Sequence, residues 1–175
     1  AIGEVESSAV VGVFLAMLVL YVFLRNVGAT LIISMAIPLS ILSTFTLMYF
    51  QELTLNLMTL GGLALGAGML VDNAIVVIEN IFRRRQIGED AAEAAILGTA
   101  EVGVPIIAAT LTTIIVFLPI IYVQGIAAEL FKDQAWVVAY ALLSSLLVAF
   151  LFIPAVAARL FKQDSAAFNR HRLRI

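Results

Sequence analysis

The feature that most constrains this chain is a succession of five apolar runs, each long enough to cross a lipid bilayer. They cover roughly residues 7–24, 31–50, 57–82, 102–123 and 135–158. The hydrocarbon core of a bilayer is about 30 Å thick and needs about 20 apolar residues per helix. Because backbone polar groups inside a bilayer must be paired within the segment, the runs predict an all-α, polytopic membrane helix bundle.

The composition agrees with a membrane protein. Apolar residues make up 63% of the chain, charged residues 13%, and the mean hydropathy is +1.11. A soluble domain of this length has far more polar surface, and the partner that these residues require is membrane lipid. We expect a transmembrane bundle over residues 1–162 and a basic cytoplasmic tail over residues 163–175, which holds the one histidine, His171. Because the chain has no cysteine and only one histidine, we expect no disulfide and no metal site. We also expect no cofactor and no nucleic-acid partner.

The connections between the runs are short, so successive spans are expected to be antiparallel neighbours. The exception is the stretch 83–101, which is long enough to hold structure of its own. Glu89, Asp90 and Glu93 precede an Ala-rich segment there, and acidic residues stabilise the start of a helix. We therefore expect a short cytoplasmic amphipathic connector helix between the third and fourth spans.

Basic residues indicate which way the bundle faces. If the spans alternate in direction, nine of the ten Lys and Arg residues lie on one side and only Lys132 lies on the other. Loops rich in Lys and Arg stay in the cytoplasm, which predicts an N-terminus outside and a C-terminus inside. Residues 1–8 carry no basic leader, and we expect the chain to be part of a longer protein. The nine are Arg25, Arg83, Arg84, Arg85, Arg159, Lys162, Arg170, Arg172 and Arg174.

One carboxylate, Asp72, lies deep inside the third span. Counting eleven residues from Arg83 at the α-helical rise places it about 16 Å inside, near the middle of the hydrocarbon. A charge at that depth costs about 3 kcal/mol or more, so we expect it to serve transport. The other four spans hold no Lys, Arg or His. Asp72 is therefore expected either to be protonated or to meet a cation from another part of the protein, and both make it a titratable switch.

Two neighbours of Asp72 have more than one interpretation. Glu79 lies seven residues further on and on nearly the same helix face, where it either pairs with Arg83 one turn away or takes part in transport. Asn73 points about 100° away from Asp72 and can hydrogen-bond to another helix. Glu79 stays a candidate for an accessory polar role, whereas Asn73 is counted with Asp72 as a proton-relay position.

Small and hydroxyl residues complete the candidate site. Gly61, Gly62, Gly66 and Gly68 are expected to let another helix pack closely against the third span. Thr110, Thr112 and Thr113 form the remaining polar cluster at depth, in the fourth span. Their hydroxyls either bond to carbonyls of their own helix or relay protons and water near Asp72.

Three stretches of the sequence resemble one family of transporters. They read GMLVDNAIVVIENIFRRR, VPIIAATLTTIIVFLPIIYVQG and LLSSLLVAFLFIPAVAARLF, and FLRNVGATLIISMAIPLSILSTF extends the similarity toward the N-terminus. The family is that of the resistance-nodulation-division (RND) efflux pumps. The five spans are similar to helices two to six of a twelve-helix subunit, that is, to the first transmembrane half.

The resemblance implies a function and a set of partners. It implies a proton-motive-force-driven drug/proton antiporter of the bacterial inner membrane, multi-pass, with a periplasmic N-terminus and a cytoplasmic C-terminus. It further implies a homotrimer that works with a periplasmic adaptor and an outer-membrane channel. The cationic partner of Asp72 would be a lysine in the remaining half of the transporter.

The same resemblance assigns residues one at a time. Asp72 matches the proton-relay aspartate of the family, and Asn73 stands where many multidrug pumps carry a second aspartate, which puts the proton stoichiometry in question. Glu79 matches the acid of the family's EN pair. Gly66 stands where heavy-metal pumps often carry an additional acid, so the sequence favours the multidrug (hydrophobe-amphiphile) branch.

Other functions stay open. They are heavy-metal export, lipid transfer or assistance in protein secretion within the same superfamily, and a non-transporting assembly bundle in which Asp72 fixes helix registry. An intramembrane aspartyl protease shares a proton between two facing aspartates, and only Asp72 is deep enough. We therefore expect no enzyme.

Overall fold

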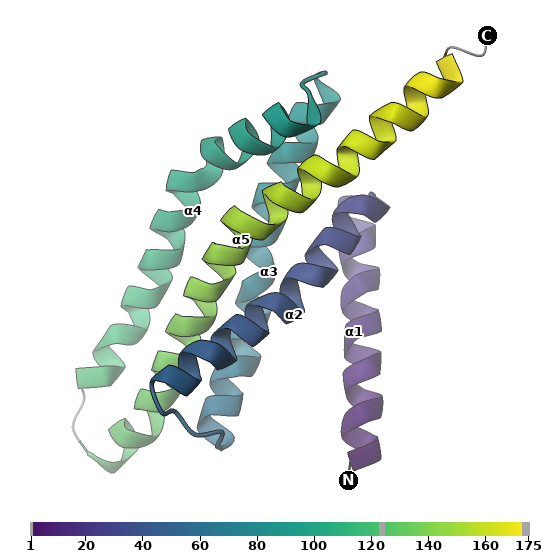
Figure 1. Ribbon diagram of the computed structural model, residues 1–175. Helices are drawn as coiled ribbons and strands as arrows, with labels where there is room; N and C mark the ends of the chain where they lie inside the picture. Colours follow the sequence, from purple (N-terminus) through teal and green to yellow (C-terminus); the bar gives the residue numbers. More distant parts are fainter. Residues whose placement is uncertain (1, 123–124, 173–175) are drawn as a thin grey trace.

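The computed structural model describes the backbone of residues 2–122 and 125–172, and the side chains of most of residues 11–161. The described part folds into helices and contains no strand, which confirms the expected all-α bundle. The side chains of the predicted tail, residues 163–175, lie outside the described part. The helices are α1 (Ile2–Leu24), α2 (Val27–Phe50), α3 (Leu57–Gln86), α4 (Ala91–Tyr122) and α5 (Ile126–Arg172) (Figure 1).

Four of these helices contain a segment long and apolar enough to cross a membrane. The segments are Val27–Phe50, Leu57–Gln86, Ala91–Ile120 and Phe131–Phe161. They correspond to the second to fifth predicted spans. The first predicted span, residues 7–24, lies within α1, and its crossing of the membrane stays a prediction.

Asparagine side chains begin two of the helices. Asn26 Oδ1 accepts a hydrogen bond from the Ala29 amide at 2.9 Å, which caps α2. Asn56 Oδ1 accepts from the Thr59 amide at 2.9 Å, while the Asn56 amide donates to Thr59 Oγ1 at 2.8 Å, so α3 starts with a reciprocal capping box. Such caps satisfy amides that have no partner inside the helix. They fix where α2 and α3 begin.

The predicted connector helix is not a separate element. Residues 91–101 form the first turns of α4, and the Ala92 amide donates to the Asp90 carboxylate at 3.2 Å at its start. Pro105 has no amide hydrogen to bond the Glu101 carbonyl, which is a common cause of a helix bend. Figure 1 shows that α4 changes direction after its first turns. The helix bends there and continues, so the connector and the fourth span are one element.

Helix α5 lies at the centre of the bundle. It packs against α2, α3 and α4, whereas α1 packs mainly on α2 and stands apart from the others in Figure 1. The largest side chains with almost no exposed surface include Ile33, Val77, Ile78, Ile81 and Ile153, from α2, α3 and α5. The core that holds α3 in place is therefore built on α5.

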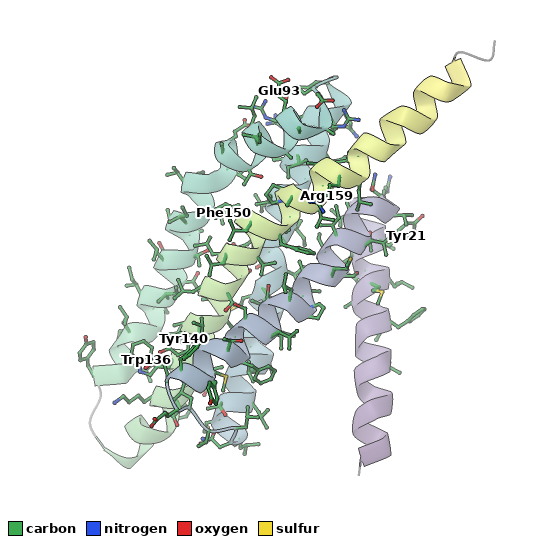
Figure 2. The ribbon with its side chains drawn as sticks, viewed as in Figure 1. Tyr21, Glu93, Trp136, Tyr140, Phe150 and Arg159 are labelled. Carbon is green, nitrogen blue, oxygen red and sulfur yellow. The ribbon has the colours of Figure 1, made fainter. Side chains whose placement is uncertain are left out.

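The two ends of the bundle differ in chemistry. The α1–α2 turn and the α3–α4 turn lie at the same end, which we call the basic end because Arg25 and Arg83–Arg85 are there. Figure 2 shows Glu93 and Arg159 toward this end, and Trp136 and Tyr140 toward the other. The rings of Trp136 and Tyr140 stack with centroids 5.6 Å apart. Amphipathic aromatic rings of this kind favour a membrane interface.

Candidate functional site

Helix α3 presents one face that no other described helix covers. Its exposed residues recur at intervals of three and four, which is the repeat of a single α-helical face. We call this stripe the Asp72 face. It comprises Gly61, Leu65, Gly68, Asp72, Val76, Glu79 and Arg83.

Asp72 lies at the midpoint of the 30-residue helix α3. Its side chain is exposed on the Asp72 face. Throughout the part of the chain that the structure describes, no hydrogen bond or ion pair reaches its carboxylate. At this depth a carboxylate needs a proton, water or a cation, and no described basic side chain forms an ion pair with it. The structure therefore places Asp72 where only a group from outside these helices can meet it.

Asn73 points the other way, toward α4 and α5. Its amide nitrogen donates to Thr110 Oγ1 at 3.3 Å and to Ser145 Oγ at 3.4 Å. Ser145 Oγ in turn donates to the Leu70 carbonyl at 2.8 Å. Three helices thus share one polar network at the depth of Asp72. The network fixes the rotation of α3 about its axis, and with it the direction in which Asp72 points.

The three predicted threonines separate into two kinds. Thr110 is buried and faces Asn73, with which it can also bond through the amide oxygen at 3.4 Å. Thr112 and Thr113 donate to the carbonyls of Ala108 and Ala109 in their own helix, at 2.8 and 3.0 Å. Such bonds leave no hydroxyl hydrogen for a relay. Among the three, only Thr110 contacts the polar network of α3.

The four glycines also lie on two different faces. A Cβ added at Gly62 would stand 2.9 Å from the Gln134 carbonyl, and one added at Gly66 would stand 2.6 Å from Ala141 Cβ. These two let α3 and α5 approach closely. Gly61 and Gly68 are on the Asp72 face and have nothing within 4 Å of such a Cβ. Their role in close packing stays a prediction for a helix outside this chain.

Arg83 does not pair with Glu79, so the interpretation of Glu79 as half of a pair across one turn is wrong for this structure. Arg83 Nη2 lies 3.1 Å from Glu101 Oε1 and donates to Asn80 Oδ1 at 2.8 Å. Arg84 reaches Glu101 at 3.1 Å and Glu89 at 2.6 Å. Asn80 also donates to Glu101 at 3.1 Å and to the Gly98 carbonyl at 2.7 Å. Arg83 therefore pairs with Glu101 of α4 and not with Glu79, which is nearer in sequence.

These contacts form an ion-pair cluster at the basic end, which we did not predict from the sequence. Its members are Asn80, Arg83, Arg84, Glu89 and Glu101. The cluster joins the end of α3 to the first turns of α4, where Gly98 packs against Ile81 so tightly that a Cβ would lie 3.0 Å from the Ile81 Cα. The arginine run therefore has a structural role in addition to its expected role in topology.

Ser145 is the site residue that sequence reasoning missed. The signal was the Ser144–Ser145 pair, which interrupts an otherwise apolar fifth span. Both serines are buried, but only Ser145 faces α3; within the described residues the Ser144 hydroxyl has no hydrogen-bond partner. A serine pair alone does not show which member faces the acid-bearing helix.

A comparison with known protein families identifies the family of this chain. The sequence matches the model of the AcrB/AcrD/AcrF family over residues 1–174. The match covers all five helices, and with them the Asp72 face, the network around Asn73 and the ion-pair cluster. The chain is thus a multi-pass membrane protein, and it belongs to the AcrB/AcrD/AcrF family of RND transporters.

Proposed function

We propose that the chain is the part of a proton-driven efflux transporter that carries the intramembrane proton-relay aspartate, and that the transport is drug/proton antiport. The observation that carries this proposal is the position of Asp72. It lies at mid-length on a membrane helix, faces outward, and has no partner among the described residues. A carboxylate with that cost and that exposure is suited to gain and lose a proton.

The Asp72 face is where we place the remaining half of the transporter. Gly61 and Gly68 leave room beside Asp72 for the backbone of another helix, and small residues permit such close approach in membranes. A cation on that helix would pair with the ionised carboxylate. Protonation would remove the ion pair and free the two halves to shift against each other, which couples the proton to movement.

We assign the proton to Asp72 alone. Asn73 cannot ionise, and its amide is engaged with Thr110 and Ser145 on the opposite side of the Asp72 direction. Its part in the relay is to hold α3 in the rotation that exposes Asp72. One titratable group at this depth supports a stoichiometry of one proton per cycle for this half.

The remaining parts of the proposal follow from the family. We place the protein in the bacterial inner membrane with the basic end in the cytoplasm, the N-terminus in the periplasm and the C-terminus in the cytoplasm. We further propose a homotrimer that works with a periplasmic adaptor and an outer-membrane channel. Heavy-metal pumps often carry an additional acidic residue at the position of Gly66. Here Gly66 packs directly against Ala141, which leaves no space for an acidic side chain and supports the multidrug branch.

The decisive experiment replaces Asp72 by Asn in the intact transporter. We expect substrate extrusion under an imposed pH gradient to be lost while the amount of protein in the membrane is unchanged. Glu93→Gln is the matched control, because Glu93 is an exposed carboxylate in the first turn of α4, away from the Asp72 face. Extrusion that persists in the Asp72→Asn protein at the level of the Glu93→Gln protein would refute the proposal.

A further inference from the structure

A cleft opens between the α1–α2 turn and the second half of α3. Its volume is about 530 Å³, and it is lined by Asn26 on one side and by Val76, Glu79, Arg83 and Gln86 on the other. Three of these residues, Val76, Glu79 and Arg83, belong to the Asp72 face. The cleft therefore begins one turn from Asp72 and continues along the same face toward the basic end.

Glu79 is the ionisable group of this cleft that the described structure leaves unpaired. The nearest cation on its own helix, Arg83, is held by Glu101 and Asn80 on the side of α4. Across the cleft, the α1–α2 turn presents the neutral side chain of Asn26. No described group neutralises the Glu79 carboxylate, so its charge must be stabilised by water or by a group outside these helices, or be removed by a proton.

The dimensions suit a short chain of water molecules. A cavity holds one water when its volume reaches roughly 10–15 Å³, and this cleft is many times larger. Glu79 follows Asp72 by seven residues, which is about 10 Å along the helix axis. With hydrogen bonds of about 2.8 Å between oxygens, a few waters can connect the two carboxylates. The two groups share one helix face, and Val76, which lies between them on that face, is itself part of the cleft wall.

We propose that Glu79 and this cleft form the passage by which protons move between Asp72 and the basic end of the bundle. The inference rests on the proposed function of Asp72. A proton leaves the Asp72 carboxyl group for a cleft water, and the Glu79 carboxylate accepts a proton from the chain. Glu79 then gives up a proton to water at the basic end and returns to its ionised form. Asp72 is left ionised and ready for its cation.

Cysteine labelling in the intact transporter tests the passage independently of transport. The chain has no native cysteine, so each introduced cysteine is the only one in this part of the protein. Ile87→Cys, at 73% exposure in the α3–α4 turn, reports which side of the membrane the basic end faces. We expect Glu79→Cys and Val76→Cys to react with a small, charged thiol reagent from that same side.

Val116→Cys is the matched control for lipid exposure. Val116 is 67% exposed, more than Val76 at 43%, but it lies on α4 outside the cleft. We expect it to stay unreactive with the charged reagent from both sides, because thiolates do not form in hydrocarbon. Glu79→Cys and Val76→Cys that stay as unreactive as Val116→Cys would overturn the proposal of a hydrated passage.

A second measurement tests the carboxylate itself. We expect Glu79→Gln to slow gradient-driven extrusion by about tenfold or more, since positioned proton donors and acceptors contribute at least that much. Glu79→Asp keeps a carboxylate in the cleft and should retain most of the activity. An unchanged rate in Glu79→Gln, or equal losses in Glu79→Gln and Glu79→Asp, would overturn the role of Glu79.

The two proposals fail in different ways. Extrusion that survives Asp72→Asn refutes the proton-relay function, and the labelling of Glu79→Cys still reports whether water enters the cleft. An inactive Asp72→Asn protein together with an unreactive Glu79→Cys leaves the relay intact and refutes the passage alone.

Discussion

At the scale of single residues, Asp72 and Asn73 show how adjacent positions on one helix take different tasks. They differ by about 100° in direction, so one faces outward and the other faces α4 and α5. The position of Asp72 midway along α3 followed from counting residues, because helical rise is uniform; its depth in the bilayer stays a prediction. The engagement of Asn73 with Ser145 did not follow, because the two are 72 residues apart and no local pattern relates them.

The two serines of α5 provide a test of the network. Ser145→Ala removes the bond to the Leu70 carbonyl and one partner of Asn73, and we expect a loss of stability of about 0.6 kcal/mol, the average for such bonds in membranes. Unfolding of the purified transporter in mixed micelles measures it. Ser144→Ala is the control: its hydroxyl is buried without a partner in the described structure, so its removal should be neutral or stabilising. The reverse order of the two stabilities would contradict the network.

At the scale of elements, each apolar run corresponds to one helix, but the runs predict the helix ends poorly. Run length reports the bilayer crossing, whereas helices continue into the polar residues beyond it, as α4 does through residues 91–101. The sequence also could not predict which glycines face α5. Gly61 and Gly62 are the same residue type, and only the contact of Gly62 with α5 distinguishes them. The predicted Arg83–Glu79 pair was wrong for a related reason. Arg83 pairs instead with Glu101, which lies in another helix and is not a sequence neighbour.

The contact between α3 and α5 leads to a prediction for Gly66. Gly66→Ala would bring two Cβ atoms to 2.6 Å, and we expect a loss of about 1–3 kcal/mol from overpacking. Ala141→Gly in the same protein should restore much of it by removing the opposing Cβ. Gly103→Ala, where a Cβ has nothing within 4 Å, is the control and should be neutral or slightly stabilising. Thermal unfolding of the four proteins distinguishes these outcomes; equal stability of Gly66→Ala and Gly103→Ala would refute the close contact.

At the scale of the whole molecule, the bundle separates a firm interior from one open face. Helix α5 holds α2, α3 and α4, and the ion-pair cluster joins α3 to α4 at the basic end. Apart from Arg83, which belongs to the ion-pair cluster, the Asp72 face lies outside this framework. Such a division suits a subunit in which one rigid half works against another.

The orientation of the bundle can be tested directly. Leu55, 62% exposed in the α2–α3 turn, lies at the end opposite to Ile87. We expect a membrane-impermeant thiol reagent to reach Leu55→Cys from the periplasmic side and Ile87→Cys only in inverted membrane vesicles, because the arginine-rich end stays in the cytoplasm. The opposite labelling pattern would reverse the proposed topology.

The close packing of Gly62 and Gly66 on α5 has a mechanical consequence. At Gly66 the backbone of α3 faces the Ala141 methyl group, and at Gly62 it faces the Gln134 carbonyl and the Val137 Cβ. Packed interiors yield little to strain. Attraction of the Asp72 carboxylate toward a cation therefore cannot be absorbed by sliding of α3 alone. The two helices must travel together. Under the proposed relay, the arrival or departure of one proton is converted into a displacement of the central helix and of the helices packed on it.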